Sequence, residues 1–147
     1  MTKPNDTPRS FHLPVSGGEI FRIGFDSGLV LYINAPTAVY ELAFAGPFTL
    51  EQVPNQRTVL RPSTMLADDL KTFVDLVGVH VHAGVAFESG RLELDLDNES
   101  RIVIDPAEEF DAWELRGSDE LVVVCTSGGE LLVWGSLNEQ ADTSTAS

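Results

Sequence analysis

The sequence has few basic residues and a single cysteine. Its 147 residues include 9 Lys and Arg against 23 Asp and Glu, which gives a formal net charge of −14. Nucleic acids and anionic lipid surfaces are bound through Lys and Arg, so this composition argues against both kinds of partner. One cysteine cannot form an internal disulfide, which is typical of the reducing cytoplasm, where we expect the protein to be located.

The sequence also lacks long apolar runs. None approaches the ~18–20 residues that a membrane-spanning helix needs, and residues 1–10 show no secretion signal. The hydrophobic fraction of 43% is nevertheless sufficient for a core. We expect a flexible N-terminal arm (1–16), one β-rich domain (17–136) and a disordered C-terminal tail (137–147).

Motifs of the common enzyme classes are missing as well. The chain contains no phosphate loop, dinucleotide fingerprint, nucleophile elbow or zinc-ligand spacing. We therefore assign no catalytic residue, metal or cofactor, and we favour a protein that is not an enzyme.

Most of the chain has the pattern of short strands. Apolar and β-branched runs separated by turn residues predict strands over 19–25, 29–33, 38–44, 48–53, 101–104, 112–116, 121–126 and 130–135. The last two are almost wholly apolar, which predicts a central hairpin buried on both faces. One helix is expected over about 64–77, with Leu66, Leu70, Phe73, Val74 and Val77 on one apolar stripe and Gly78 at its end.

The clearest alternation predicts a hairpin of 79–87 with 91–97. A two-residue loop at Ser89-Gly90 places Val79, Val81, Ala83, Val85 and Phe87 inward, opposite Leu92, Leu94 and Leu96. In this register His82 lies opposite Asp97, and His80 lies opposite Glu99. Phe87-Glu88-Ser89-Gly90 also matches Phe25-Asp26-Ser27-Gly28 at an earlier hairpin tip.

These elements predict an α+β fold that is rich in β-structure. We expect a mainly antiparallel sandwich or open barrel, built from two β-meander units with one helix between them.

His80 and His82 form the most distinctive polar cluster. Two histidines at i and i+2 on a strand point the same way. With Asp97 and Glu99 opposite, the set has the ligand types of a divalent-metal site or of a pH-sensitive contact. Two surface histidines beside acids are the simplest interpretation, and we assign no metal.

The negative charge is concentrated in the second half of the chain. Residues 1–71 carry seven acids and six bases, whereas residues 72–147 carry sixteen acids and three bases. Glu93, Asp95, Asp97 and Glu99 are expected to line the outer face of the predicted hairpin. This candidate acidic face would attract a basic protein partner, or it would serve solubility alone.

Three further residues are expected to have structural roles. Cys125 lies in an apolar run, which predicts a buried and inert thiol. Trp113 and Trp134 are expected in the core or in a hairpin, and an exposed tryptophan would instead indicate an interface anchor.

The C-terminal third carries a family resemblance. Phe110-Asp111-Ala112-Trp113-Glu114-Leu115, Val124-Cys125 and Gly128-Gly129-Glu130-Leu131-Leu132-Val133-Trp134 resemble the motifs of a small actinobacterial family classified as a domain of unknown function, DUF6188. The resemblance extends over roughly 18–134. It implies a short, β-rich, cytoplasmic bacterial protein and no activity or ligand.

The sequence leaves three functions open. A non-enzymatic module that binds a basic protein, as an immunity protein binds a toxin, is favoured; its binding would weaken at high salt and on Asp95, Asp97 or Glu99→Lys changes. A small-ligand or metal-binding protein or an enzyme that uses His80, His82, Asp97 and Glu99 is the first alternative, and a structural subunit of a homo-oligomer is the second. The oligomeric state is not determined by the sequence.

Overall fold

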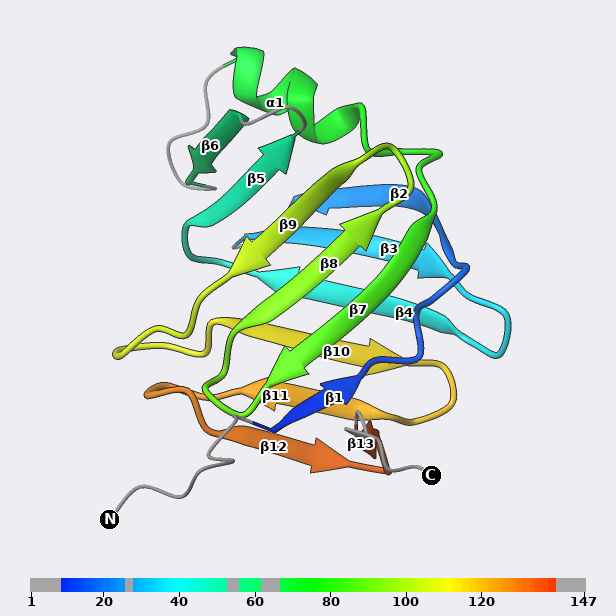
Figure 1. The fold of residues 1–147 in the computed structure, drawn as a ribbon, viewed down its shortest axis with the longest axis vertical. Coiled ribbons are helices and arrows are strands. Elements are labelled where there is room, and N and C mark those ends of the chain that lie inside the picture. The colour runs from blue at the N-terminus through cyan, green and yellow to red at the C-terminus, as the bar shows by residue number, and fades with distance from the viewer. Residues whose placement is uncertain (1–8, 26–27, 53–55, 62–66, 140–147) are drawn as a thin grey trace.

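Two antiparallel sheets pack face to face in the computed structural model, which describes residues 9–25, 28–52, 56–61 and 67–139. Figure 1 shows the two layers, with strands that cross in different directions. Sheet A has the order β13-β1-β7-β8-β9-β5-β6, and sheet B has the order β12-β11-β10-β4-β3-β2. The expected β-rich antiparallel sandwich is confirmed, and the described strands do not close into a barrel.

Sheet A combines strands from both halves of the chain. It contains β1 (Ser10–His12), β5 (Phe48–Gln52), β6 (Gln56–Leu60), β7 (Val81–Phe87), β8 (Leu92–Leu96), β9 (Ser100–Ile104) and β13 (Asn138–Glu139). Sheet B contains β2 (Glu19–Phe25), β3 (Leu29–Asn34), β4 (Val39–Phe44), β10 (Trp113–Gly117), β11 (Val122–Cys125) and β12 (Leu131–Trp134). The two expected meanders are present as β2-β3-β4 and β7-β8-β9. A third, β10-β11-β12, extends sheet B when β10 pairs with β4.

Alternate residues of each strand fill the space between the sheets. Leu29, Leu31 and Ile33 of β3 in sheet B and Leu92, Leu94 and Leu96 of β8 in sheet A belong to one continuous core. Each of these six side chains is almost fully buried. Burial of a side chain of this size stabilises the fold by about 1.5–3 kcal/mol, so the core is the main source of stability.

The helix α1 (Ala67–Val74) lies at the top of the sandwich (Figure 1). Phe73 is fully buried and packs edge-on against Phe44 and Phe48, at ring-centroid distances of 6.3 and 5.9 Å. The expected apolar stripe is wrong in its extent, because Leu70, Val74 and Val77 are exposed. The described helix ends at Val74, three residues before the expected end, and the expected start with Leu66 lies outside the described residues.

The β7–β8 hairpin differs from the expected register by one residue. Phe87 N–H donates to Arg91 O and Gly90 N–H donates to Phe87 O, both at 2.8 Å, so the turn has three residues with Gly90 at φ +100°. Gly84 and Ala86 therefore pair with Leu94 and Leu92 and face the core. The three-residue turn with a left-handed glycine is a common hairpin closure, and the two-residue loop expected from the sequence is wrong.

The N-terminal segment is a second reason why the side chains of Ala83, Val85 and Phe87 point away from the core. Leu13 and Val15 are buried against β7, and a Cβ at Gly84 would lie 2.8 Å from a methyl group of Val15. Small residues on β7 thus make room for side chains that come from a distant part of the chain. A bulge between Val81 and Ala83 then restores Val81 to the core.

Strand pairing reaches both ends of the described part of the chain. Ser10–His12 pairs with β7, and Asn138–Glu139 pairs with β1. These strands fall within the segments expected as the arm (1–16) and the tail (137–147). Residues 1–8 and 140–147 lie outside the described residues, and the expected division into arm, domain and tail stays a prediction.

The last hairpin is not a central strand pair. β12 is the edge strand of sheet B, and Leu132, Val133 and Trp134 are all exposed. The expectation that both faces are buried is wrong for both strands: in β11 only the face of Val123 and Cys125 is fully buried, while Val122 and Val124 are half-buried, and most of β12 is exposed. An apolar edge strand of this kind is a feature that soluble proteins usually avoid.

The two sheets are joined at one end by a backbone contact between two turns. A Cβ at Gly90 of the β7–β8 turn would lie 2.7 Å from the Cα and O of Gly129 in the β11–β12 turn. Gly90 O accepts hydrogen bonds from Trp113 Nε1 at 2.9 Å and from Cys125 Sγ at 3.3 Å. Only glycine fits this approach, since both turn residues also have positive φ.

Alanine substitutions at two turn glycines separate the cost of left-handed strain from the cost of losing the contact between the two turns. Gly128→Ala adds a Cβ that meets no atom within 4 Å at φ +87°, and we expect a loss of about 1 kcal/mol from left-handed strain alone. Gly90→Ala has the same strain plus the collision with Gly129, and we expect a further loss of about 1–3 kcal/mol. Urea unfolding of both variants measures the difference, and equal losses would show that the contact does not matter.

Candidate functional site

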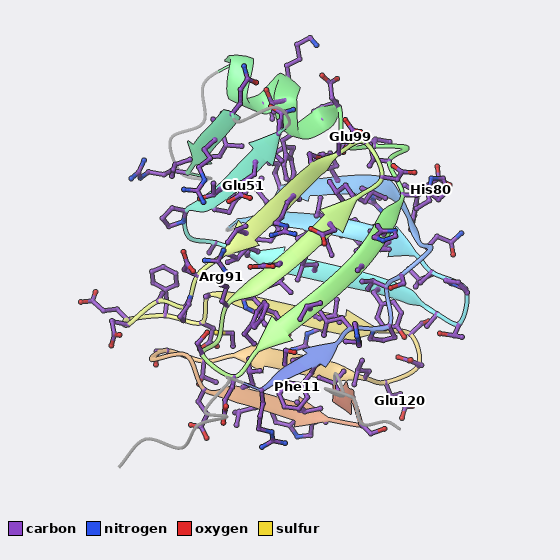
Figure 2. All side chains as sticks on the ribbon, viewed as in Figure 1. Phe11, Glu51, His80, Arg91, Glu99 and Glu120 are labelled. Carbon is purple, nitrogen blue, oxygen red and sulfur yellow. The ribbon has the colours of Figure 1, made fainter. Side chains whose placement is uncertain are left out.

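The predicted histidine cluster is divided between two places. Figure 2 shows His80 and Glu99 near the end of sheet A where β8 turns into β9. His80 N–H donates to Asp97 Oδ1 at 3.2 Å, and His80 Nδ1 lies 3.8 Å from Asp97 Oδ2. The partner of His80 is therefore Asp97, and the expected opposition of His80 to Glu99 and of His82 to Asp97 is wrong. Within the described part of the chain, no three His, Cys, Asp or Glu side chains are arranged to hold a metal ion.

The outer face of sheet A carries a cross-strand row of alternating charges. Asp95 of β8 lies opposite Arg101 of β9, Arg101 lies opposite Glu51 of β5, and Glu51 lies opposite Arg57 of β6. The ion-pair distances are 2.5 Å from Arg101 Nε to Asp95 Oδ1 and 2.9 Å from Arg57 Nη2 to Glu51 Oε2. The hydrogen bond to Asp95 raises the pKa of the Arg101 guanidinium. Each acid of this row thus faces a base.

Glu93 extends this network to the lower end of β8. Its carboxylate lies 2.9 Å from Arg91 Nε and 3.4 Å from Arg101 Nη1, and Arg91 also reaches Asp105 at 3.2 Å. Of the four residues of the candidate acidic face, Glu93 and Asp95 are thus paired with arginine, Asp97 contacts His80, and Glu99 lies in the β8–β9 turn. The face is less negative than its acids alone suggest, and its role as an interaction face stays a prediction.

A groove of about 450 Å³ runs along the same outer face. It brings His82 and Glu99 together with the Asp95–Arg101 and Glu51–Arg57 pairs. The groove therefore offers both signs of charge and one imidazole, which suits a small polar molecule better than an apolar one.

A different acidic surface lies in the loop between β9 and β10, which projects from one end of the sandwich (Figure 1). We call Glu108, Glu109, Phe110 and Asp111 the Phe110 surface. All four residues are exposed, and the phenyl side chain keeps 43% of its surface accessible. None of the three acids makes an ion pair with another described residue, which contrasts with the paired charges of sheet A.

The loop that carries this surface is fixed at both ends. Gly128 N–H donates to Ala107 O at 2.7 Å, and Ala112 N–H donates to Cys125 O at 3.0 Å. The phenyl ring of Phe110 lies over Gly46, where a Cβ would come within 2.9 Å of two ring carbons. These contacts hold Phe110 in one position on the surface.

Cys125, Trp113 and Trp134 lie in the core or in a hairpin, as expected from the sequence. Cys125 is fully buried, so the expected burial is confirmed, and burial raises the pKa of its thiol, which disfavours the reactive thiolate. Trp113 is buried in the core, whereas Trp134 has 55% of its surface exposed. Sequence patterns alone do not distinguish these two tryptophans, because both lie in short apolar strands.

The opposite end of β10 holds a buried tyrosine paired with an acid. Tyr40 O–H donates to Asp119 Oδ2 at 2.7 Å, and Leu121 N–H donates to Asp119 Oδ1 at 3.2 Å. The hydrogen bond from Tyr40 lowers the pKa of Asp119, and burial together with Asp119 raises the pKa of Tyr40. Near neutral pH the tyrosine is therefore protonated and Asp119 carries a fixed negative charge.

This pair makes stability depend on pH in the acid range. Because the pKa of Asp119 is lowered on folding, its stabilisation is fully present above the unfolded value of about 3.9 and is lost as the pH falls through the folded value. We expect Tyr40→Phe to lower the unfolding free energy at pH 7 by about 1 kcal/mol and to weaken the dependence on acid pH. Urea unfolding at a series of pH values between about 3 and 7 measures the unfolding free energy and its dependence on pH. Tyr32→Phe is the control, and an identical acid profile in the two variants would contradict the assignment.

Comparisons with known proteins place the chain in a family. The model of a family described as "Family of unknown function (DUF6188)" matches residues 11–135, which spans β1 to β12. No match was found among curated proteins or among solved structures. Among the described residues, no helix has the length and apolar character needed to cross a membrane. The chain belongs to the DUF6188 family, a family of unknown function.

Proposed function

We propose that this protein is a non-enzymatic interaction module that binds a basic protein partner through the Phe110 surface. The observation that carries the proposal is the exposed Phe110 surrounded by Glu108, Glu109 and Asp111, three acids without an ion pair among the described residues. Neutralisation of a basic toxin by an immunity protein is one role of this kind.

The distribution of charge supports the choice of this surface over the outer face of sheet A. On sheet A, Arg91, Arg101 and Arg57 already pair with the neighbouring carboxylates. A basic group that binds Glu93 or Asp95 would have to displace those arginines, so the binding free energy gained at these two acids would be small. The acids beside Phe110 have no such competitor, so they are free to pair with Lys or Arg of a partner.

Phe110 supplies the apolar part of the surface. Aromatic residues at the centre of an interface contribute a large share of binding energy when a ring of polar groups excludes water around them. Because Phe110 already rests on Gly46, little side-chain entropy is lost when a partner covers the ring. The net charge of −14 would accelerate the encounter with a basic protein.

The groove on sheet A favours a second candidate function, the binding of a small polar ligand. Its volume of about 450 Å³ is in the range of small-molecule sites, and it contains His82, Glu99 and two arginines. This candidate retains part of the histidine and acid set noted in the sequence. For either function we expect a cytoplasmic location, in which the buried Cys125 stays reduced.

Two charge reversals distinguish the Phe110 surface from the outer face of sheet A. Peptides that bind the native protein are selected from a random library, and we expect the selected peptides to be basic. Glu109→Lys should weaken their binding by about tenfold, whereas Glu99→Lys makes the same change in net charge at the other end of the sandwich and should have little effect. Binding of both variants is measured by isothermal titration at low and high salt.

Three results of the peptide-binding test would contradict the proposal. Selected peptides without basic residues, salt-independent binding, or a larger loss with Glu99→Lys than with Glu109→Lys would each contradict the proposal. The last result would instead support the acidic face of Glu93, Asp95, Asp97 and Glu99.

The aromatic contribution is tested by truncation. Phe110→Ala should weaken the same peptides by about tenfold or more, with little change in the melting temperature because the ring is 43% exposed. Phe21→Ala is the control, since Phe21 has a similar exposure of 44% on sheet B. Equal effects of the two substitutions on binding would show that Phe110 is not an anchor.

A further inference from the structure

A hollow of about 470 Å³ lies at the end of the sandwich opposite to the Phe110 surface. It forms where the β10–β11 turn approaches the end of β12, and Figure 2 shows Glu120 of this turn at the lower right. Tyr40, Asp119, Glu120, Leu121 and Trp134 are among its lining residues. The hollow thus combines two carboxylates, a buried phenol, a buried leucine and an exposed tryptophan.

The turn that carries the carboxylates is held rigidly. Ser118 N–H donates to Val39 O at 2.8 Å, and Val39 N–H donates to Ser118 Oγ at 3.0 Å. A side chain at Gly117 would collide with Tyr40 and Asp119, so this glycine permits their close contact. The carboxylate of Asp119 is therefore fixed before any ligand arrives.

The lining of this hollow is negative without compensation. Asp119 and Glu120 are both exposed, neither forms an ion pair with another described residue, and no Lys, Arg or His lines the hollow. By contrast, the groove on sheet A contains Arg57 and Arg101. The hydrogen bond from Tyr40 keeps Asp119 ionised over a wide pH range, so the charge persists near neutral pH.

Trp134 adds the second element of a cation site. It is 55% exposed on an edge strand, although an apolar side chain of this size is normally covered. An indole beside carboxylates is well suited to an organic cation, because the ring face attracts positive charge and the carboxylates accept its hydrogen bonds.

We propose that this hollow binds the cationic side chain of an arginine or lysine presented by a polypeptide, with Asp119 and Glu120 as the charged partners and Trp134 as the aromatic one. The proposal does not rest on the Phe110 surface, because the two sites lie at opposite ends of β10. Either one can fail without the other.

Nuclear magnetic resonance of the two indole groups tests the proposal on the full chain. The sequence has two tryptophans, and Trp113 Nε1–H is buried and donates to Gly90 O. Titration with Nα-acetyl-arginine methylamide should shift the Trp134 indole signal, with an affinity of order millimolar, and should leave the Trp113 signal in place. The matched citrulline derivative has the same shape without the charge and should produce no shift. The lysine derivative, compared with its Nε-acetylated form, should behave in the same way.

Substitutions of the two acids test whether they cause the shift of the Trp134 indole signal. Glu120→Gln and Asp119→Asn should each weaken the response to the arginine derivative by about tenfold. Glu130→Gln removes an exposed acid that does not line the hollow, and it should have no effect. The amide spectrum of each variant reports whether the fold is intact; Glu120→Gln keeps the test valid if Asp119→Asn unfolds, because Glu120 has no contact with Tyr40 in the described hydrogen bonds.

Three results would overturn the proposal. They are an equal shift with the citrulline derivative, no Trp134 shift with either cation, and a loss of response in Glu130→Gln that equals the loss in Glu120→Gln. The first would indicate apolar stacking on the indole, and the last would indicate attraction by overall negative charge.

Discussion

The contact between Gly90 and Gly129 determines how the two sheets meet at one end of the molecule. A hydrophobic core attracts two sheets without fixing their relative position, because apolar attraction has no preferred direction. Two turns that touch backbone to backbone do fix it, since any side chain at either position would separate them. The hydrogen bonds from Trp113 and Cys125 to Gly90 O connect this contact to the centre of sheet B, where β10 and β11 lie. The β9–β10 loop then rests on the same turn, through Gly128 and Ala107.

The strand β10 links this joint to both candidate sites. Its first residue, Trp113, lies beside the joint and follows the Phe110 surface, and its last residue, Gly117, leads into the turn of Asp119 and Glu120. Both ends of β10 are therefore held by contacts that leave little freedom to the adjoining loops. Sites on rigid loops lose less entropy on binding than sites on flexible ones, which favours both loops over the termini as binding elements. The buried Tyr40 on the neighbouring strand gives the second site the same support, because its hydroxyl group reaches the turn from inside the core.

The sequence predicts the strands of this fold better than it predicts what covers them. Leu92, Leu94 and Leu96 face the core as their alternation indicates, because a strand with one polar and one apolar face has only one stable orientation. For β7 the alternation is misleading: Gly84 and Ala86 face inward because Leu13 and Val15, about seventy residues earlier by the printed numbering, fill the space above them. The same limit applies to β12, whose apolar residues indicate burial while its position at the sheet edge leaves them exposed. No local pattern encodes either neighbour. In the candidate sites, the alternation of the sequence indicates the acids and histidines of the β7–β8 region. The pairing of Glu93 and Asp95 with Arg91 and Arg101 depends on the register of neighbouring strands, which the local sequence does not encode.

The arrangement of charge then follows from this geometry. Side chains on the broad face of a sheet have neighbours at fixed spacing on both sides, so unlike charges can alternate as Asp95, Arg101, Glu51 and Arg57 do. Loops at the ends of the sandwich have fewer such neighbours. With only nine basic residues in the chain, acids collect there that have no ion pair with another described residue, beside Phe110 at one end and Trp134 at the other. Repulsion among these acids opposes folding only weakly, because water screens exposed charges. A basic partner that covers an aromatic ring would exclude that water and strengthen the attraction, so the same acids that contribute little to the isolated fold would contribute most to a complex.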